Sequence, residues 1–122
     1  MDFKMIHNNI NVLDLQKSLE FYSRAFGFTE DSRITPASGD FIIVYLKDGQ
    51  GSHRLELTWL RDRDTPYELG DNEIHLALET SDIKGALERH KSMDCVCFEN
   101  PAMGIYFVED PDGYWIEILP AK

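Results

Sequence analysis

Two histidines and two glutamates recur at matching places along the chain, and this recurrence limits the possible folds more than any other feature of the sequence. His7 and His75 each open a stretch with the alternation of a β-strand, and Glu56 and Glu117 each stand between two aliphatic residues. Neighbouring side chains of a strand point to opposite faces. The aliphatic residues are therefore expected to face helices, and the four polar residues the other side of the sheet.

The two halves of the chain match when one is laid over the other. A displacement of 68 positions places His7 on His75 and Asp14 on Asp82, so an expected strand and the cap of an expected helix stay in register. From histidine to glutamate there are 49 positions in the first half and 42 in the second, a difference typical of a loop insertion in diverged repeats. The sequence therefore predicts two related modules.

The apolar pattern predicts the same order of elements, βαβββ, in both modules and hence an α+β fold. In the first, strands are expected at 5–12, 29–34, 41–47 and 53–60, with a helix capped by Asp14 and ended by Gly27. In the second, strands are expected at 74–80, 95–99, 105–109 and 115–119, with a helix from 82 to about 93.

The length predicts one domain. With 122 residues, 43% of them hydrophobic, the chain can bury one ordinary core, whereas each half is too small to be a domain by itself. We therefore interpret 1–122 as a single domain, with module one at about 1–63, a polar linker at 61–70 and module two at about 72–122.

Charge and hydropathy exclude several classes of protein. The 22 acidic and 12 basic residues give a formal charge of −10, and no run of Lys or Arg offers the basic surface that nucleic acids require. A membrane-spanning helix needs about 18 consecutive apolar residues, and no stretch of the chain is that long. The first residues also lack the apolar core of a signal peptide. We expect a soluble cytoplasmic protein that binds neither nucleic acid nor membrane.

The cysteines and two of the histidines are interpreted as structural. Cys95 and Cys97 are two apart in an expected strand, where they share a face but lie too far apart to form a disulfide easily. They are interpreted as buried thiols, because the pair lacks the two-residue spacer and partner cluster of a zinc site. His53 and His90 have no counterpart in the other module.

A single histidine or glutamate in a strand is more often hydrogen-bonded or solvated than a metal ligand. Four at matched positions reverse that expectation. Two imidazoles and two carboxylates on one sheet face repel or stay unsatisfied unless they share something, and a divalent cation meets that need. His7, Glu56, His75 and Glu117 are therefore the candidate ligands of a metal site.

The stretch EDPDGYWIEIL at 109–119 resembles the C-terminal signature of glyoxalase I, the lactoylglutathione lyase family of the vicinal oxygen chelate superfamily. Matching segments cover nearly the whole chain: IH at 6–7, FYSRAFG at 21–27, LELT at 55–58, YELG at 67–70 and IHLAL at 74–78. The resemblance implies two βαβββ modules that form a U-shaped mixed sheet around a metal. It also implies that His7, Glu56, His75 and Glu117 are the ligands, a set that distinguishes glyoxalase I from relatives in which the first glutamate is replaced.

The resemblance further implies the activity and the cofactor. Glyoxalase I enzymes isomerise the hemithioacetal of methylglyoxal and a thiol to an S-lactoyl thioester. A carboxylate beside the reacting carbon moves the proton, a role that the family pattern gives first to Glu117 and, for the opposite stereoisomer, to Glu56. Nickel or cobalt is favoured because the chain resembles the short bacterial forms, zinc is possible, and a homodimer is expected.

Departures from the family pattern concern the thiol. Asn11 stands where the family has an arginine that holds a glutathione carboxylate, Leu60 stands where it has an asparagine, and the loop at 100–104 lacks a lysine. Losing a bidentate arginine removes a strong and specific contact, so the identity of the thiol stays open. The residues expected to contact the substrate are Asn9, Asn11, Trp115 and Met103, although the two asparagines also suit structural hydrogen bonds and Trp115 an interface.

Two alternatives stay open. The chain could be another metal enzyme of the superfamily, such as an epimerase, a lyase or a thiol transferase. It could also be a noncatalytic protein of the same fold that binds small molecules in its cleft, which predicts no tightly bound metal.

Overall fold

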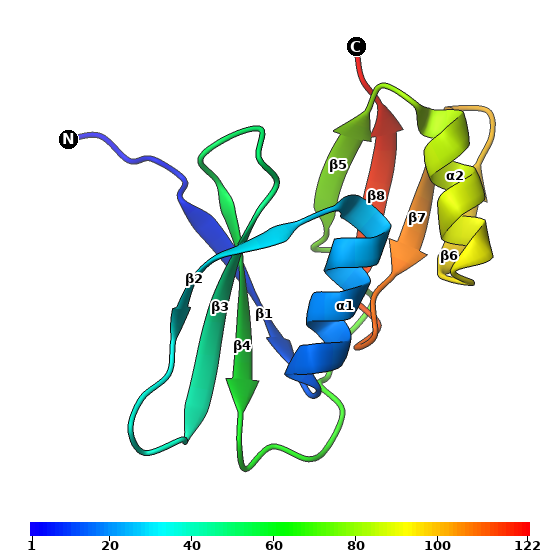
Figure 1. The fold of residues 1–122 in the computed structure, drawn as a ribbon. Coiled ribbons are helices and arrows are strands. Elements are labelled where there is room, and N and C mark those ends of the chain that lie inside the picture. The colour runs from blue at the N-terminus through cyan, green and yellow to red at the C-terminus, as the bar shows by residue number, and fades with distance from the viewer. The chain divides into compact units, whose positions relative to one another are not determined.

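Each half of the chain forms a four-stranded mixed β-sheet with one helix (Figure 1). The structure is a computed structural model that describes residues 1–122. It divides into two units, Met1–Tyr67 and Glu68–Lys122, and the division falls inside the segment that the sequence predicts as a linker. The prediction of an α+β fold with two βαβββ modules is confirmed.

The first unit contains β1 (His7–Val12), α1 (Leu15–Phe26), β2 (Thr29–Ile34), β3 (Phe41–Lys47) and β4 (Arg54–Leu60). Its sheet has the order β1-β4-β3-β2, in which β1 runs parallel to β4 and the other pairs are antiparallel. The buried residues of these strands are aliphatic: Val12, Val44, Leu46, Leu55 and Leu57. Their alternation with polar residues leaves one face of the sheet for the candidate site.

Local sequence signals fix both ends of α1. The Asp14 side chain accepts a hydrogen bond from the backbone N–H of Lys17 over 3.1 Å, which satisfies one of the free donors at the start of the helix. Gly27 ends the helix with φ 73°, a left-handed conformation that glycine adopts without a steric penalty. Both predicted boundaries are confirmed.

The second unit contains β5 (Leu76–Thr80), α2 (Ile83–Ser92), β6 (Val96–Asn100), β7 (Ile105–Glu109) and β8 (Trp115–Pro120). Its sheet order, β5-β8-β7-β6, repeats that of the first unit, with β5 parallel to β8. Tyr106, Val108, Ile116 and Ile118 are buried. His90 of α2 is 2% exposed and its Nδ1 lies 2.7 Å from the Tyr106 hydroxyl, which confirms the structural interpretation of this histidine.

Two expectations about strand starts are wrong. β1 begins at His7 and β5 at Leu76, so the preceding residues Met5, Ile6 and Ile74 lie outside the ladders. Ile74 is 97% exposed and does not face a helix. The alternation of apolar and polar residues begins two positions before the first residue of each strand. The pattern alone therefore does not show where the strand begins.

The cysteines are free but only partly buried, which corrects the expectation of buried thiols. Cys95 precedes β6, and the register of this outer strand is irregular between Val96 and Phe98, on either side of Cys97. Burial still raises the pKa of the Cys97 thiol to about 11. The thiol is therefore protonated at neutral pH and is a poor nucleophile or metal ligand.

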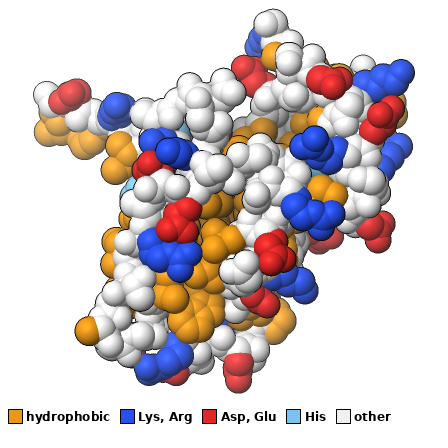
Figure 2. Space-filling view, in the orientation of Figure 1, with side chains coloured by type: hydrophobic (Ala, Val, Ile, Leu, Met, Phe, Trp, Pro, Cys, Tyr) orange, Lys and Arg blue, Asp and Glu red, His pale blue; other side chains and the backbone are white.

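On the face shown in Figure 2, Lys and Arg side chains alternate with Asp and Glu and do not gather into one large basic patch. Neither helix has the length and apolar character that crossing a membrane requires.

Candidate metal centre

The first pair of candidate ligands is held by two neighbouring strands. His7 opens β1 and Glu56 lies within β4, and the register of these parallel strands places Asn9 beside Glu56. Nε2 of His7 lies 3.8 Å from Oε1 of Glu56, and the two side chains are 35% and 13% exposed. Because Leu55 and Leu57 point into the core, Glu56 is directed to the opposite face of the sheet.

The second pair has the same composition and a fixed histidine. His75 immediately precedes β5, Glu117 lies within β8, and His75 Nε2 is 3.3 Å from Glu117 Oε1. Nδ1 of His75 lies 3.1 Å from the carbonyl oxygen of Glu73. Because a carbonyl only accepts, Nδ1 carries the proton of the neutral ring and Nε2 keeps its lone pair toward Glu117.

This donor set fits a divalent cation. In the neutral imidazole the lone pair of Nε2 and the carboxylate oxygen face each other, and either a proton or a metal cation between them relieves the repulsion. Imidazole nitrogen and carboxylate oxygen are ligands that nickel, cobalt and zinc all accept, and a histidine fixed through Nδ1 by a carbonyl is common among metal ligands. Each pair is a group of two, and no three His, Cys, Asp or Glu side chains in the structure gather closely enough to hold a metal ion.

The Glu56 carboxylate is held from both neighbouring strands. Tyr45, which lies opposite Glu56 on β3, donates a hydrogen bond from its hydroxyl to the carboxylate, and this bond raises the pKa of Tyr45. From β1, Nδ2 of Asn9 donates to Glu56 Oε1 over 2.9 Å and to Oγ1 of Thr58 over 2.6 Å. The amide takes this orientation because the reverse would set its oxygen against the carboxylate.

The surroundings of Glu117 are apolar instead. Ala77 of β5 and Phe107 of β7 lie beside it in register. The Phe107 ring lies 5.4 Å from Trp115 and 6.2 Å from Phe98 between ring centroids, so three aromatic rings cover this part of the sheet. Neither strand neighbour of Glu117 has a side chain that can donate a hydrogen bond.

The four residues predicted to contact the substrate lie on different elements: two on β1, one on β8 and one in the turn between β6 and β7. Asn9 and Asn11 share the face of β1 that carries His7, beside Glu56. Trp115 lies two residues before Glu117 and packs in the aromatic cluster. Met103 lies in the turn between β6 and β7, is 68% exposed, and donates its backbone N–H to the Asn100 carbonyl.

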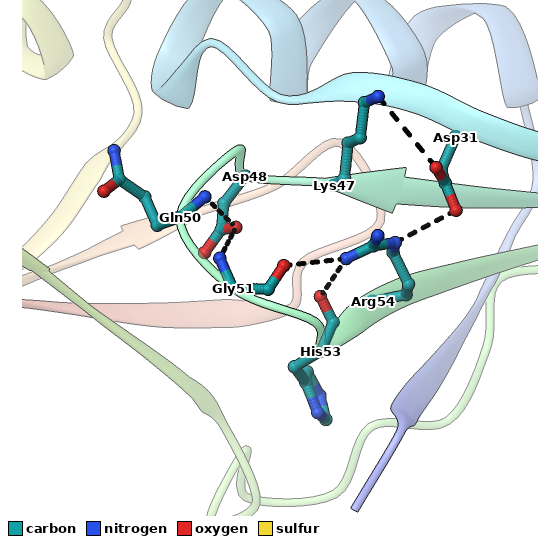
Figure 3. Close-up of polar contacts among 7 residues, drawn as sticks. All are labelled: Asp31, Lys47, Asp48, Gln50, Gly51, His53 and Arg54. Carbon is teal, nitrogen blue, oxygen red and sulfur yellow. Dashed lines mark hydrogen bonds and ion pairs between the residues drawn. The ribbon is translucent and has the colours of Figure 1, made fainter.

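Arg54 is a residue near the first pair that sequence reasoning missed. It lies beside His7 in the register of β1 and β4. As Figure 3 shows, its Nε donates to Asp31 over 3.0 Å and its Nη1 donates to the carbonyl oxygens of Gly51 and His53. A fixed guanidinium therefore lies next to the candidate centre, with its charge compensated by Asp31.

Tyr45 was missed for the same reason as Arg54. Both act through partners on other strands or in turns, and only the cross-strand register reveals these partners. Spacing along the chain gives no signal, because Tyr45 lies 11 positions before Glu56 whereas Phe107 lies 10 positions before Glu117. Only the strand register shows that both rings stand opposite the glutamates.

Fold and site define a duplicated α+β protein that carries one histidine–glutamate pair in each module. The sequence profile of the Glyoxalase/Bleomycin resistance protein/Dioxygenase superfamily matches residues 4–118. The chain belongs to this superfamily, whose enzymes generally use divalent metals.

Individual relatives show which enzymes of the superfamily the chain is similar to. A probable lactoylglutathione lyase from Synechocystis is 33% identical over 125 residues, covering 94% of this chain and 93% of that protein. Lactoylglutathione lyase from Neisseria meningitidis serogroup A is 31% identical over 126 residues, covering 98% and 91%. The structure of the trypanothione-dependent glyoxalase I of Leishmania major aligns with a TM-score of 0.85 at 28% identity, over 98% of this chain and 87% of that one. Within the superfamily, this chain is a lyase of the glyoxalase I type.

Proposed function

We propose that the chain catalyses the metal-dependent isomerisation of a methylglyoxal–thiol hemithioacetal to the S-lactoyl thioester. The proposed ligands of one divalent ion are His7, Glu56, His75 and Glu117, with nickel or cobalt favoured and zinc possible. The observation that supports this most is the matching pair on each sheet, with nitrogen–oxygen distances of 3.8 and 3.3 Å.

The side chains suit the proton transfer that this reaction needs. Glu117 takes the proton from the carbon that bears sulfur and returns it to the neighbouring carbon, while the hydroxyl proton moves between the two oxygens. A bound divalent ion supplies positive charge beside the two substrate oxygens, where negative charge develops. The aromatic rings of Phe107 and Trp115 help to keep water from the Glu117 carboxylate.

We propose that the protein does not hold its thiol through the contacts that the family uses for glutathione. Asn11 and Leu60 cannot replace a bidentate arginine and an asparagine amide, and the turn at 100–104 carries no cation. A related glyoxalase I uses trypanothione, so thiols do vary among structural relatives. Asn11, Trp115 and Met103 remain proposed substrate contacts, and Asn9 joins them through the oxygen of its amide.

A turnover assay tests the proposal. Protein loaded with nickel or cobalt, with occupancy confirmed by elemental analysis, is supplied with methylglyoxal and one of glutathione, cysteine or another small thiol, and thioester formation is followed by absorbance. We expect turnover with at least one thiol and none after chelation. Fully loaded protein that turns over no thiol adduct would contradict the proposal, and protein that binds no metal at all would favour the noncatalytic alternative.

A further inference from the structure

We propose that Tyr45 and Asn9 are positioning residues that hold Glu56 as a fixed metal ligand and thereby leave proton transfer to Glu117. This inference rests on the proposed function, because it assigns different tasks to the two glutamates of that site. In the family pattern both glutamates carry protons, one for each stereoisomer. The structure shows that they do not have equivalent surroundings here.

The two sheets provide an internal comparison. On the third strand of each module, Tyr45 lies opposite Glu56 and Phe107 lies opposite Glu117. On the first strand, Asn9 lies beside Glu56 and Ala77 lies beside Glu117. Matching backbone positions therefore carry hydrogen-bond donors around one glutamate and hydrocarbon around the other.

These donors restrict Glu56. Its carboxylate accepts from the Tyr45 hydroxyl and, over 2.9 Å, from the Asn9 amide, and it lies 3.8 Å from His7. Asn9 is itself fixed, because its amide also donates to Thr58 over 2.6 Å. A carboxylate that accepts hydrogen bonds from two neighbouring strands keeps one orientation, which suits a permanent metal ligand. The same hydrogen bonds occupy its lone pairs and so oppose proton transfer.

Glu117 has the opposite properties. Its polar neighbour is His75, at 3.3 Å, and the neighbouring strands present Phe107 and Ala77. Without hydrogen-bond donors from these strands, the carboxylate can rotate toward a substrate carbon.

The Tyr45 ring also contacts His7, with 5.5 Å between ring centroids, so a purely structural role has to be separated from positioning. Tyr45→Phe keeps the ring and removes only the hydroxyl. Tyr67→Phe is a matched control, because the Tyr67 hydroxyl is buried without a hydrogen-bond partner. Circular dichroism and thermal melting of the metal-free variants establish that each folds.

Calorimetric titration with Ni²⁺ provides a readout that does not depend on turnover. We expect Tyr45→Phe and Asn9→Ala each to weaken Ni²⁺ binding by roughly 10-fold or more, as loss of a ligand's hydrogen-bond partner commonly does. Tyr67→Phe should bind Ni²⁺ as the parent does. Parent-like Ni²⁺ affinity in both Tyr45→Phe and Asn9→Ala overturns the inference.

The reciprocal variant tests the other half of the inference. Phe107→Tyr places a hydroxyl opposite Glu117 at the register position that Tyr45 occupies opposite Glu56. We expect kcat at saturating Ni²⁺ to fall about 10-fold with KM little changed, because the new donor occupies the carboxylate that moves the proton. An unchanged kcat in a folded Phe107→Tyr variant contradicts the assignment to Glu117.

Failure of the inference and failure of the proposed function are distinguishable. If the parent protein binds no Ni²⁺ or shows no turnover with any thiol, the proposed function fails and the inference fails with it. If the parent is active and the variants match it, only the division of roles between the glutamates is wrong.

Discussion

At the scale of single residues, Glu56 and Glu117 show how cross-strand neighbours give different properties to identical side chains. Both stand between buried aliphatic residues and both lie near a histidine. Tyr45 then donates a hydrogen bond to Glu56, whereas Phe107 offers none to Glu117. The chemical difference between the two modules therefore comes from the residues opposite the ligands, not from the ligands.

Substitution of each glutamate should separate proton transfer from metal binding. Glu117→Gln keeps an oxygen that can face a metal but cannot accept the substrate proton, so we expect kcat to fall about 10²- to 10⁴-fold in the metal-loaded enzyme. Glu56→Gln should mainly weaken Ni²⁺ affinity and retain more turnover at saturating metal. Steady-state kinetics at confirmed metal occupancy check both outcomes, and a Glu117→Gln enzyme with a near-normal rate refutes the role of Glu117.

At the scale of elements, the sequence predicts the strands and helices closely because the signals are local. Alternation marks all eight strands to within two residues, and Asp14 and Gly27 mark the ends of α1. The partners of each strand are not local. The Asn9 and Tyr45 contacts to Glu56 depend on which strands pair and in which register, and no pattern within one strand specifies that.

The end of α1 allows a direct test of one local signal. Gly27 has φ 73°, and a side chain in this conformation is strained even though no atom lies within 4 Å of the place that a Cβ would occupy. Gly27→Ala should lower the free energy of unfolding by about 1 kcal/mol. Gly51→Ala is the control, because Gly51 lacks a positive φ and also has open space, so its unfolding free energy should change little. Urea unfolding measures both, and equal effects would show that φ is not the cause.

At the scale of the whole molecule, duplication distributes the candidate ligands over both units. Each unit supplies one histidine and one glutamate, and neither unit holds a group of three acidic, histidine or cysteine ligands. We propose, as the resemblance implies, that the protein acts as a homodimer. One metal ion then draws its ligands either from one chain or from two copies, and both arrangements make metal binding a property of the assembled protein.

Metal removal tests this dependence on both units. A ligand that binds only the folded state stabilises it by about 2.7 kcal/mol at 100 times its dissociation constant, so Ni²⁺ should raise the melting temperature by roughly 10 °C and chelation should reverse the change. His7→Ala and His75→Ala should each remove most of this stabilisation, because each deletes one ligand of the same ion. His53→Ala, an exposed histidine in neither pair, should retain it. If His75→Ala keeps the full Ni²⁺-dependent shift while His7→Ala loses it, the first unit binds the ion alone and the four-ligand proposal is wrong.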